Sequence, residues 1–189
     1  MSSNANPAAI RPLRYITGRG GDGSRGLSAY LATLASDYQC LAIDTAFLIQ
    51  DLDTQLAQVR EFSASSNGGS LMANSYGGYL LMLSLIDVTT VPERVLLLSP
   101  LLGRSVLPEK MASSRPPRER LLRAALEEGR VSRPHYLEII TGAADEICCP
   151  VLAQSVASQL VVDRFSLLEN EEHMISAELV QAGVEAYLG

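Results

Sequence analysis

The sequence lacks tryptophan, and aromatic residues make up only 5% of its 189 residues. This composition disfavours a protein that stacks nucleic acid bases on aromatic side chains. An excess of basic residues is also missing, because 15 lysines and arginines are outnumbered by 21 aspartates and glutamates, for a net charge of −6. Proteins that bind nucleic acid usually present a basic face. We therefore expect no nucleic acid partner.

Cysteine is scarce, and long apolar runs are missing. Cys40, Cys148 and Cys149 form neither an even disulfide framework nor a CxxC pair, which suits a reducing compartment. We interpret Cys148 and Cys149 as small buried apolar residues rather than as a metal or redox pair. No apolar run approaches the roughly 20 residues that span a bilayer, and residues 1–12 lack the basic and apolar regions of a secretory signal. We expect a cytoplasmic protein without a membrane span, and a flexible tail over residues 1–12.

Apolar residues make up 47% of the chain, and short apolar runs alternate with helical patterns from residue 13 onwards. Strands are predicted at 13–17, 40–44, 70–74, 94–99, 136–141 and 164–168, and helices at 27–36, 51–63, 77–86, 149–160 and 175–188. Such alternation is typical of an α/β fold with helices on both faces of a six-stranded, mostly parallel sheet. We expect a single domain over residues 13–189.

The segment 101–135 interrupts the alternation of strands and helices. It is rich in proline, serine and arginine, contains a helical pattern, and carries eight basic residues against four glutamates. An insertion after a strand lies at the edge of the sheet where α/β folds place their sites. We predict a short cap or lid in which Arg120 and Arg123 favour an anionic substrate. The alternative is a helix that packs on the body and exposes its charges to solvent.

A serine lies where a predicted strand passes directly into a predicted helix. The residues around Ser75 read Ala-Asn-Ser-Tyr-Gly, a small-x-Ser-x-Gly pattern. A turn of this kind projects the serine hydroxyl above the sheet, and it requires small side chains such as Ala73 and Gly77 beside it. Because a serine hydroxyl is a weak nucleophile on its own, the pattern calls for a base.

Two histidines are available as that base. His135 precedes the fifth predicted strand, and we interpret it as structural, whereas His173 follows the sixth. The base in turn needs an acid to orient it. Asp145 follows the fifth strand more closely than its neighbour Glu146, the second candidate. Ser75, Asp145 and His173 thus each follow a predicted strand.

Along the chain these three residues come in the order serine, aspartate, histidine. In this order the chain resembles the α/β-hydrolase superfamily, whose catalytic triad has the same order. The resemblance extends from Leu13 to Leu188, as in a compact member without the first two strands. It implies a carboxylesterase or thioesterase that cleaves a small ester or thioester through an acyl-enzyme, with Ser75, Asp145 and His173 as the catalytic triad. It implies neither a metal nor an organic cofactor.

The resemblance also implies where the oxyanion and the substrate bind. The family uses the backbone N–H of the residue after the nucleophile, here Tyr76, and an N–H from the loop after the first strand, here Arg19. Gly18 and Gly20 of the same loop are then expected beside the substrate. The chain has Thr17 before Gly18, where many members have histidine.

The glycine loop also supports a different class of function. Residues 18–23 match GxGxxG directly after a strand, and Asp44 follows about 20 residues later, as in dinucleotide-binding proteins. An NAD(P)-binding reductase is therefore an alternative, although it leaves Ser75, Asp145 and His173 without a shared role. A protein that uses the fold only to bind a ligand or a partner is another alternative.

Overall fold

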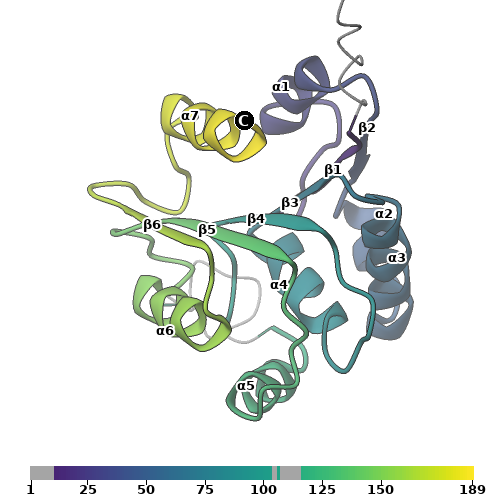
Figure 1. The fold of residues 1–189 in the computed structure, drawn as a ribbon, viewed down its shortest axis with the longest axis vertical. Helices are drawn as coiled ribbons and strands as arrows, with labels where there is room; N and C mark the ends of the chain where they lie inside the picture. Colours follow the sequence, from purple (N-terminus) through teal and green to yellow (C-terminus); the bar gives the residue numbers. More distant parts are fainter. Residues whose placement is uncertain (1–10, 104–105, 107–115) are drawn as a thin grey trace, which may run out of the picture.

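A six-stranded sheet forms the centre of the computed structural model, which describes residues 11–103, 106 and 116–189. Its strands are all parallel and lie in the order β2-β1-β3-β4-β5-β6 (Figure 1). They are β1 (Leu13–Ile16), β2 (Tyr38–Leu41), β3 (Ser70–Asn74), β4 (Arg94–Leu98), β5 (Tyr136–Gly142) and β6 (Arg164–Leu168). The central strands are buried on both faces, which explains their continuous apolar runs.

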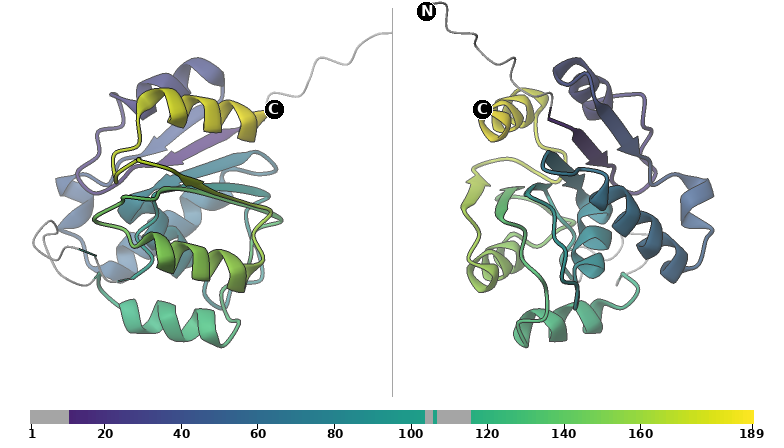
Figure 2. Two further views of the ribbon diagram at one scale, coloured as in Figure 1. Left: turned by 90° about the vertical axis from the view of Figure 1, so that its left-hand side faces the viewer. Right: turned by 45° about the vertical axis from the view of Figure 1, so that its right-hand side comes forward.

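Helices cover both faces of the sheet, as the sequence predicts (Figures 1 and 2). They are α1 (Leu27–Leu34), α2 (Thr45–Leu48), α3 (Leu52–Ala64), α4 (Ser75–Ser84), α5 (Glu119–Glu127), α6 (Pro150–Leu160) and α7 (Ala177–Leu188). Leu31 of α1 and Val184 of α7 are buried in the core on one face. The larger core on the other face holds side chains of α3, α4, α5 and α6. None of the helices in the described ranges is long and apolar enough to cross a membrane.

The second strand differs from its prediction at residues 40–44. It covers Tyr38–Leu41 and ends there because the hydroxyl oxygen of Thr17 accepts the Ile43 N–H at 2.8 Å, which draws the chain away from the sheet. Asp44 then begins α2 by accepting the Phe47 N–H at 2.9 Å. The predicted bounds of this strand are wrong, and the four-residue helix α2 is absent from the prediction.

The described part of the segment 101–135 contains one helix, α5, which packs against α6 on the same side of the sheet (Figure 2). Leu122, Ala125 and Leu126 form its buried face. The helix is therefore part of the body, as in the second interpretation of this segment. The rest of the predicted cap, residues 104, 105 and 107–115, lies outside the described residues, as does most of the predicted tail over residues 1–12.

Candidate active site

Strand β3 passes into helix α4 at Ser75 without an intervening loop. Ser75 has a φ of 49°, in the left-handed region that is strained for a residue with a side chain. Two residues later, a Cβ atom on Gly77 would lie 2.2 Å from the carbonyl oxygen of Thr17, so only glycine fits. Two residues earlier, Ala73 is fully buried. The predicted turn with small flanking residues is present.

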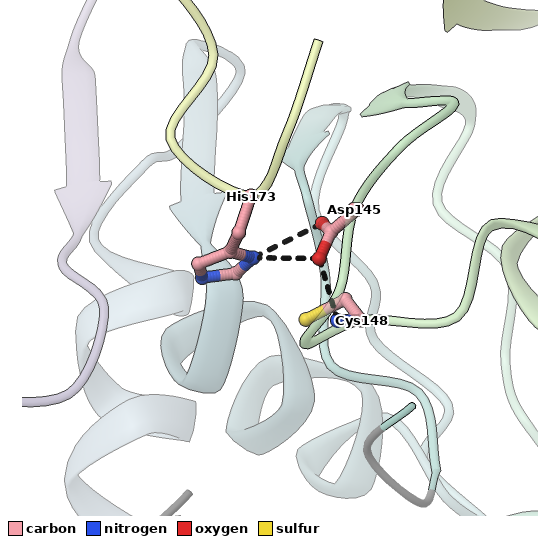
Figure 3. Close-up of side chains that lie close together, drawn as sticks. All are labelled: Asp145, Cys148 and His173. Carbon is pink, nitrogen blue, oxygen red and sulfur yellow. Dashed lines mark hydrogen bonds and ion pairs between the residues drawn. The ribbon is translucent and has the colours of Figure 1, made fainter. Parts of the chain in front are cut away.

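Asp145 and His173 form a direct pair in the loops after β5 and β6 (Figure 3). The distances from His173 Nδ1 to Asp145 Oδ2 and Oδ1 are 3.0 and 3.2 Å. The Oδ1 atom also accepts the backbone N–H groups of Ile147 at 2.9 Å and of Cys148 at 2.7 Å. These bonds hold the buried carboxylate in place, so it fixes the orientation of the imidazole ring.

The loops that carry this pair are held together by backbone contacts. The Ala144 N–H donates to the Glu171 carbonyl at 2.9 Å. A Cβ atom on Gly142 would lie 2.2 Å from the same carbonyl oxygen, so glycine allows the approach. Glu146, the second candidate acid, accepts the backbone N–H of His173 at 3.4 Å and does not bond to the ring. It positions the loop, whereas Asp145 orients the imidazole.

Ser75 and His173 line the same cavity, which has a volume of about 570 Å³. In the described part of the chain, no hydrogen bond joins the Ser75 hydroxyl to the imidazole, whose bonds are those to Asp145. The cavity is also lined by the turn at Tyr76 and by the glycine loop after β1, including Gly18, Arg19 and Gly20.

The backbone N–H groups of Tyr76 and Arg19 have no hydrogen-bond partner among the described residues. Both residues line the cavity, and the guanidinium of Arg19 lies 5.8 Å from the centre of the Tyr76 ring. Free N–H groups beside a nucleophile are suited to stabilise an oxyanion.

A second cavity of about 390 Å³ adjoins the first between α1 and α7, and the two share His173 and Met174 among their lining residues. Its walls are mainly apolar, with Leu98 from β4, Ile175 from the loop after β6 and Val180 from α7. An apolar cavity beside a polar site is typical of the sites that bind small molecules.

Arg120 and Arg123 differ from their predicted position beside the substrate. Both are exposed on α5 and line neither cavity, because α5 turns Leu122 and Leu126 towards the core and these arginines towards solvent. Leu101, Pro116 and Pro117 are the described residues of this segment that line the first cavity. His135 is exposed at the start of β5, at the opposite end of the sheet from His173.

The glycine loop and Asp44, which in the sequence suggest dinucleotide binding, have structural roles in this fold. Helix α1 does not begin directly after residues 18–23 but at Leu27, following Gly26 with a φ of 54°. The Asp44 carboxylate, expected to bind a ribose, caps α2 instead.

Cys148 is a residue of this site that the sequence analysis did not place there. It is 1% exposed, which agrees with its interpretation as a buried residue. Burial raises the pKa of its thiol, the carboxylate of Asp145 adds to the increase, and a side-chain hydrogen bond with Ser75 acts in the opposite direction. The signal in the sequence is the spacing, because an aspartate in a turn can accept N–H groups from the residues that follow it, as Asp145 does from Ile147 and Cys148.

No protein-family model and no curated protein matches the sequence. Solved structures do match. A monoacylglycerol lipase from Paleococcus ferrophilus superposes with a TM-score of 0.70 at 14% identity, covering 93% of each chain. Est1E from Butyrivibrio proteoclasticus has a TM-score of 0.68 at 15% identity, covering 97% of this chain and 89% of its own.

A third structure comes from Xanthomonas campestris and is assigned to the α/β-hydrolase superfamily. Its TM-score is 0.65 at 14% identity, and 95% of each chain is covered. Identities this low establish the architecture and leave the chemistry to be argued from the site. The chain has the fold of the α/β-hydrolase superfamily, as the order of its serine, aspartate and histidine predicts.

Proposed function

We propose that the protein is a serine hydrolase that cleaves an ester or a thioester at Ser75. The observation that carries the proposal is a strained serine at a strand-to-helix turn, in one cavity with a histidine that an aspartate orients. The esterase and lipase among the structural neighbours support the same class of reaction. A protein that only binds ligands has no need for the strain at Ser75.

In this mechanism, Ser75 Oγ attacks the carbonyl carbon while Nε2 of His173 takes the hydroxyl proton. Asp145 stabilises the imidazolium through Nδ1. The tetrahedral oxyanion accepts hydrogen bonds from the N–H groups of Tyr76 and Arg19, and losing one such donor typically lowers kcat by about 10²- to 10³-fold. His173 then protonates the leaving group, and water repeats the sequence on the acyl-enzyme.

One movement is required before the attack. The Ser75 hydroxyl must come within hydrogen-bond reach of the His173 ring, whose bonds among the described residues are those to Asp145. Hydrogen bonds between nucleophile and base are often long or absent without substrate and form in the complex, so the resting geometry fits this mechanism.

We expect a fluorophosphonate probe to label one residue per chain, Ser75, because the probe reacts only with an activated serine hydroxyl. Intact mass and peptide mapping measure this. Ser75→Ala should abolish labelling, whereas Ser99→Ala should retain it, since Ser99 also follows a strand with a positive φ but is buried and does not line the first cavity. Labelling that survives Ser75→Ala, or a folded wild-type protein that remains unlabelled, contradicts the proposal.

The second cavity favours an ester with an apolar acyl chain. We expect kcat/KM to be higher for p-nitrophenyl octanoate than for the acetate, because the longer chain reaches Leu98, Ile175 and Val180. Val180→Phe fills this cavity and should reduce the preference for octanoate by roughly tenfold or more, with the acetate rate unchanged. Leu179→Phe is the control, because Leu179 is exposed and lines neither cavity. An equal change for both esters would contradict a role of this cavity in chain binding.

A further inference from the structure

Three side chains with different donor atoms converge between the loops after β5 and β6 (Figure 3). One oxygen of Asp145, the sulfur of Cys148 and one ring nitrogen of His173 all lie within 4.8 Å of one another. Asp145 and Cys148 are buried, and His173 is half-buried at the wall of the first cavity. Within residues 11–103, 106 and 116–189, no other group of three such residues comes together in this way.

This donor set suits zinc. Zn²⁺ binds cysteine sulfur at about 2.3 Å and histidine nitrogen or carboxylate oxygen at about 2.0–2.2 Å, in a tetrahedron whose corners are then roughly 3.3–3.5 Å apart. His173 Nδ1 and Asp145 Oδ2 are already 3.0 Å apart. The Cys148 sulfur lies at most 4.8 Å from the other two donor atoms. It therefore needs to approach by no more than about 1.5 Å to reach the tetrahedral spacing. We propose that Asp145, Cys148 and His173 form an inhibitory site for Zn²⁺.

The charges of the zinc ion and its protein ligands cancel at this buried site. The Cys148 thiol releases its proton to water and binds as a thiolate, and the carboxylate of Asp145 binds as it is. The hydrogen on His173 Nδ1 moves to Nε2, so Nδ1 offers its lone pair. One thiolate, one carboxylate and one Zn²⁺ sum to zero charge, which avoids the cost of an unpaired buried ion. The fourth position is left for water.

Zinc binding removes the contact on which the hydrolase mechanism depends. The ion takes the place of the hydrogen between His173 and Asp145, and the hydrogen now on Nε2 leaves that atom without a lone pair to accept the Ser75 proton. Entry is through the first cavity, whose wall includes His173. The inhibition rests on the proposed function, whereas the binding of zinc does not.

Zinc binding is tested first, on the full chain in reduced form after treatment with EDTA. Competition with a chromophoric chelator should show one Zn²⁺ per chain in the wild type. Cys148→Val removes the sulfur and keeps an apolar side chain, and it should weaken binding by at least about tenfold. Cys149→Val is the matched control, because Cys149 is adjacent and free but outside the cluster. Cys148→Ala serves as a second variant should circular dichroism show a loss of fold.

Cobalt(II) provides an independent spectroscopic readout. The wild type and Cys149→Val should show the near-ultraviolet absorption of a cobalt–thiolate bond, and Cys148→Val should not. The proposal is overturned if the wild type binds no zinc, or if a folded Cys148 variant binds it as tightly as the wild type.

The hydrolysis of p-nitrophenyl esters then tests inhibition, with each variant compared with its own rate in EDTA. Zinc should stop ester hydrolysis by the wild type and by Cys149→Val, and EDTA should restore it in both. Hydrolysis by Cys148→Val should continue in the presence of zinc. Zinc that binds through Cys148 without slowing hydrolysis refutes an inhibitory role. If the metal-free wild type hydrolyses no ester, the proposed function is refuted instead. The zinc-binding results are independent of that outcome.

Discussion

His173→Ala is expected to lower kcat for ester hydrolysis by roughly 10⁴- to 10⁶-fold, because the Ser75 hydroxyl then has no base. Asp145→Asn should lower it by about 10⁴-fold, since an amide no longer selects the imidazole tautomer that Asp145 holds through its contacts with Nδ1. Steady-state kinetics on a p-nitrophenyl ester measures both, with circular dichroism to verify the fold.

The control for these variants is His135→Ala, which removes the second histidine at the opposite end of the sheet and should leave kcat nearly unchanged. Because members of a triad act as a unit, the double variant of Asp145 and His173 should be little slower than His173→Ala alone. Full activity in His173→Ala would show that His173 is not the base and would contradict the proposed triad.

Gly77→Ala is expected to lower the free energy of unfolding by about 3 kcal/mol, and Gly183→Ala to leave it almost unchanged. A Cβ atom on Gly77 would lie 2.2 Å from the Thr17 carbonyl oxygen and 2.8 Å from Cγ2 of Ile16, so α4 must move away from β1. On Gly183 it would meet only Cδ1 of Ile140, the end of a flexible side chain.

Both glycines lie in helices, so the gain of about 1 kcal/mol in helix propensity is common to the two variants, and the difference reports the clash. Urea denaturation measures the two free energies. If Gly77→Ala unfolds at the same urea concentration as Gly183→Ala, the close approach of α4 to β1 is not a constraint on the sequence.

Much of this fold follows from the order of apolar runs. The strands at 70–74 and 164–168 are found at the predicted bounds, because each run is bounded by residues that leave the sheet. The second strand is misplaced because Thr17, far away in the sequence, takes the Ile43 N–H out of the ladder. A side chain that competes for a backbone donor is invisible to an analysis of local patterns.

The candidate site is predictable where topology alone decides. Ser75, Asp145 and His173 each follow a parallel strand, and parallel strands end at the same edge. The loop contacts that complete the site depend on three-dimensional packing instead. The place of Cys148 beside Asp145 depends on the path of the loop after β5. The outward direction of Arg120 depends on how α5 rotates onto the sheet.

The loop after β6 carries His173, and β6 is an edge strand that pairs only with β5. Its residues are half-buried or exposed, whereas the strand that precedes Ser75 lies in the protected centre of the sheet. Edge elements open in local fluctuations that cost less free energy than global unfolding. The proposed nucleophile and the proposed base thus belong to regions of unequal local stability. We therefore expect local opening of β6 to disrupt the arrangement of Ser75 and His173 while the rest of the sheet remains folded.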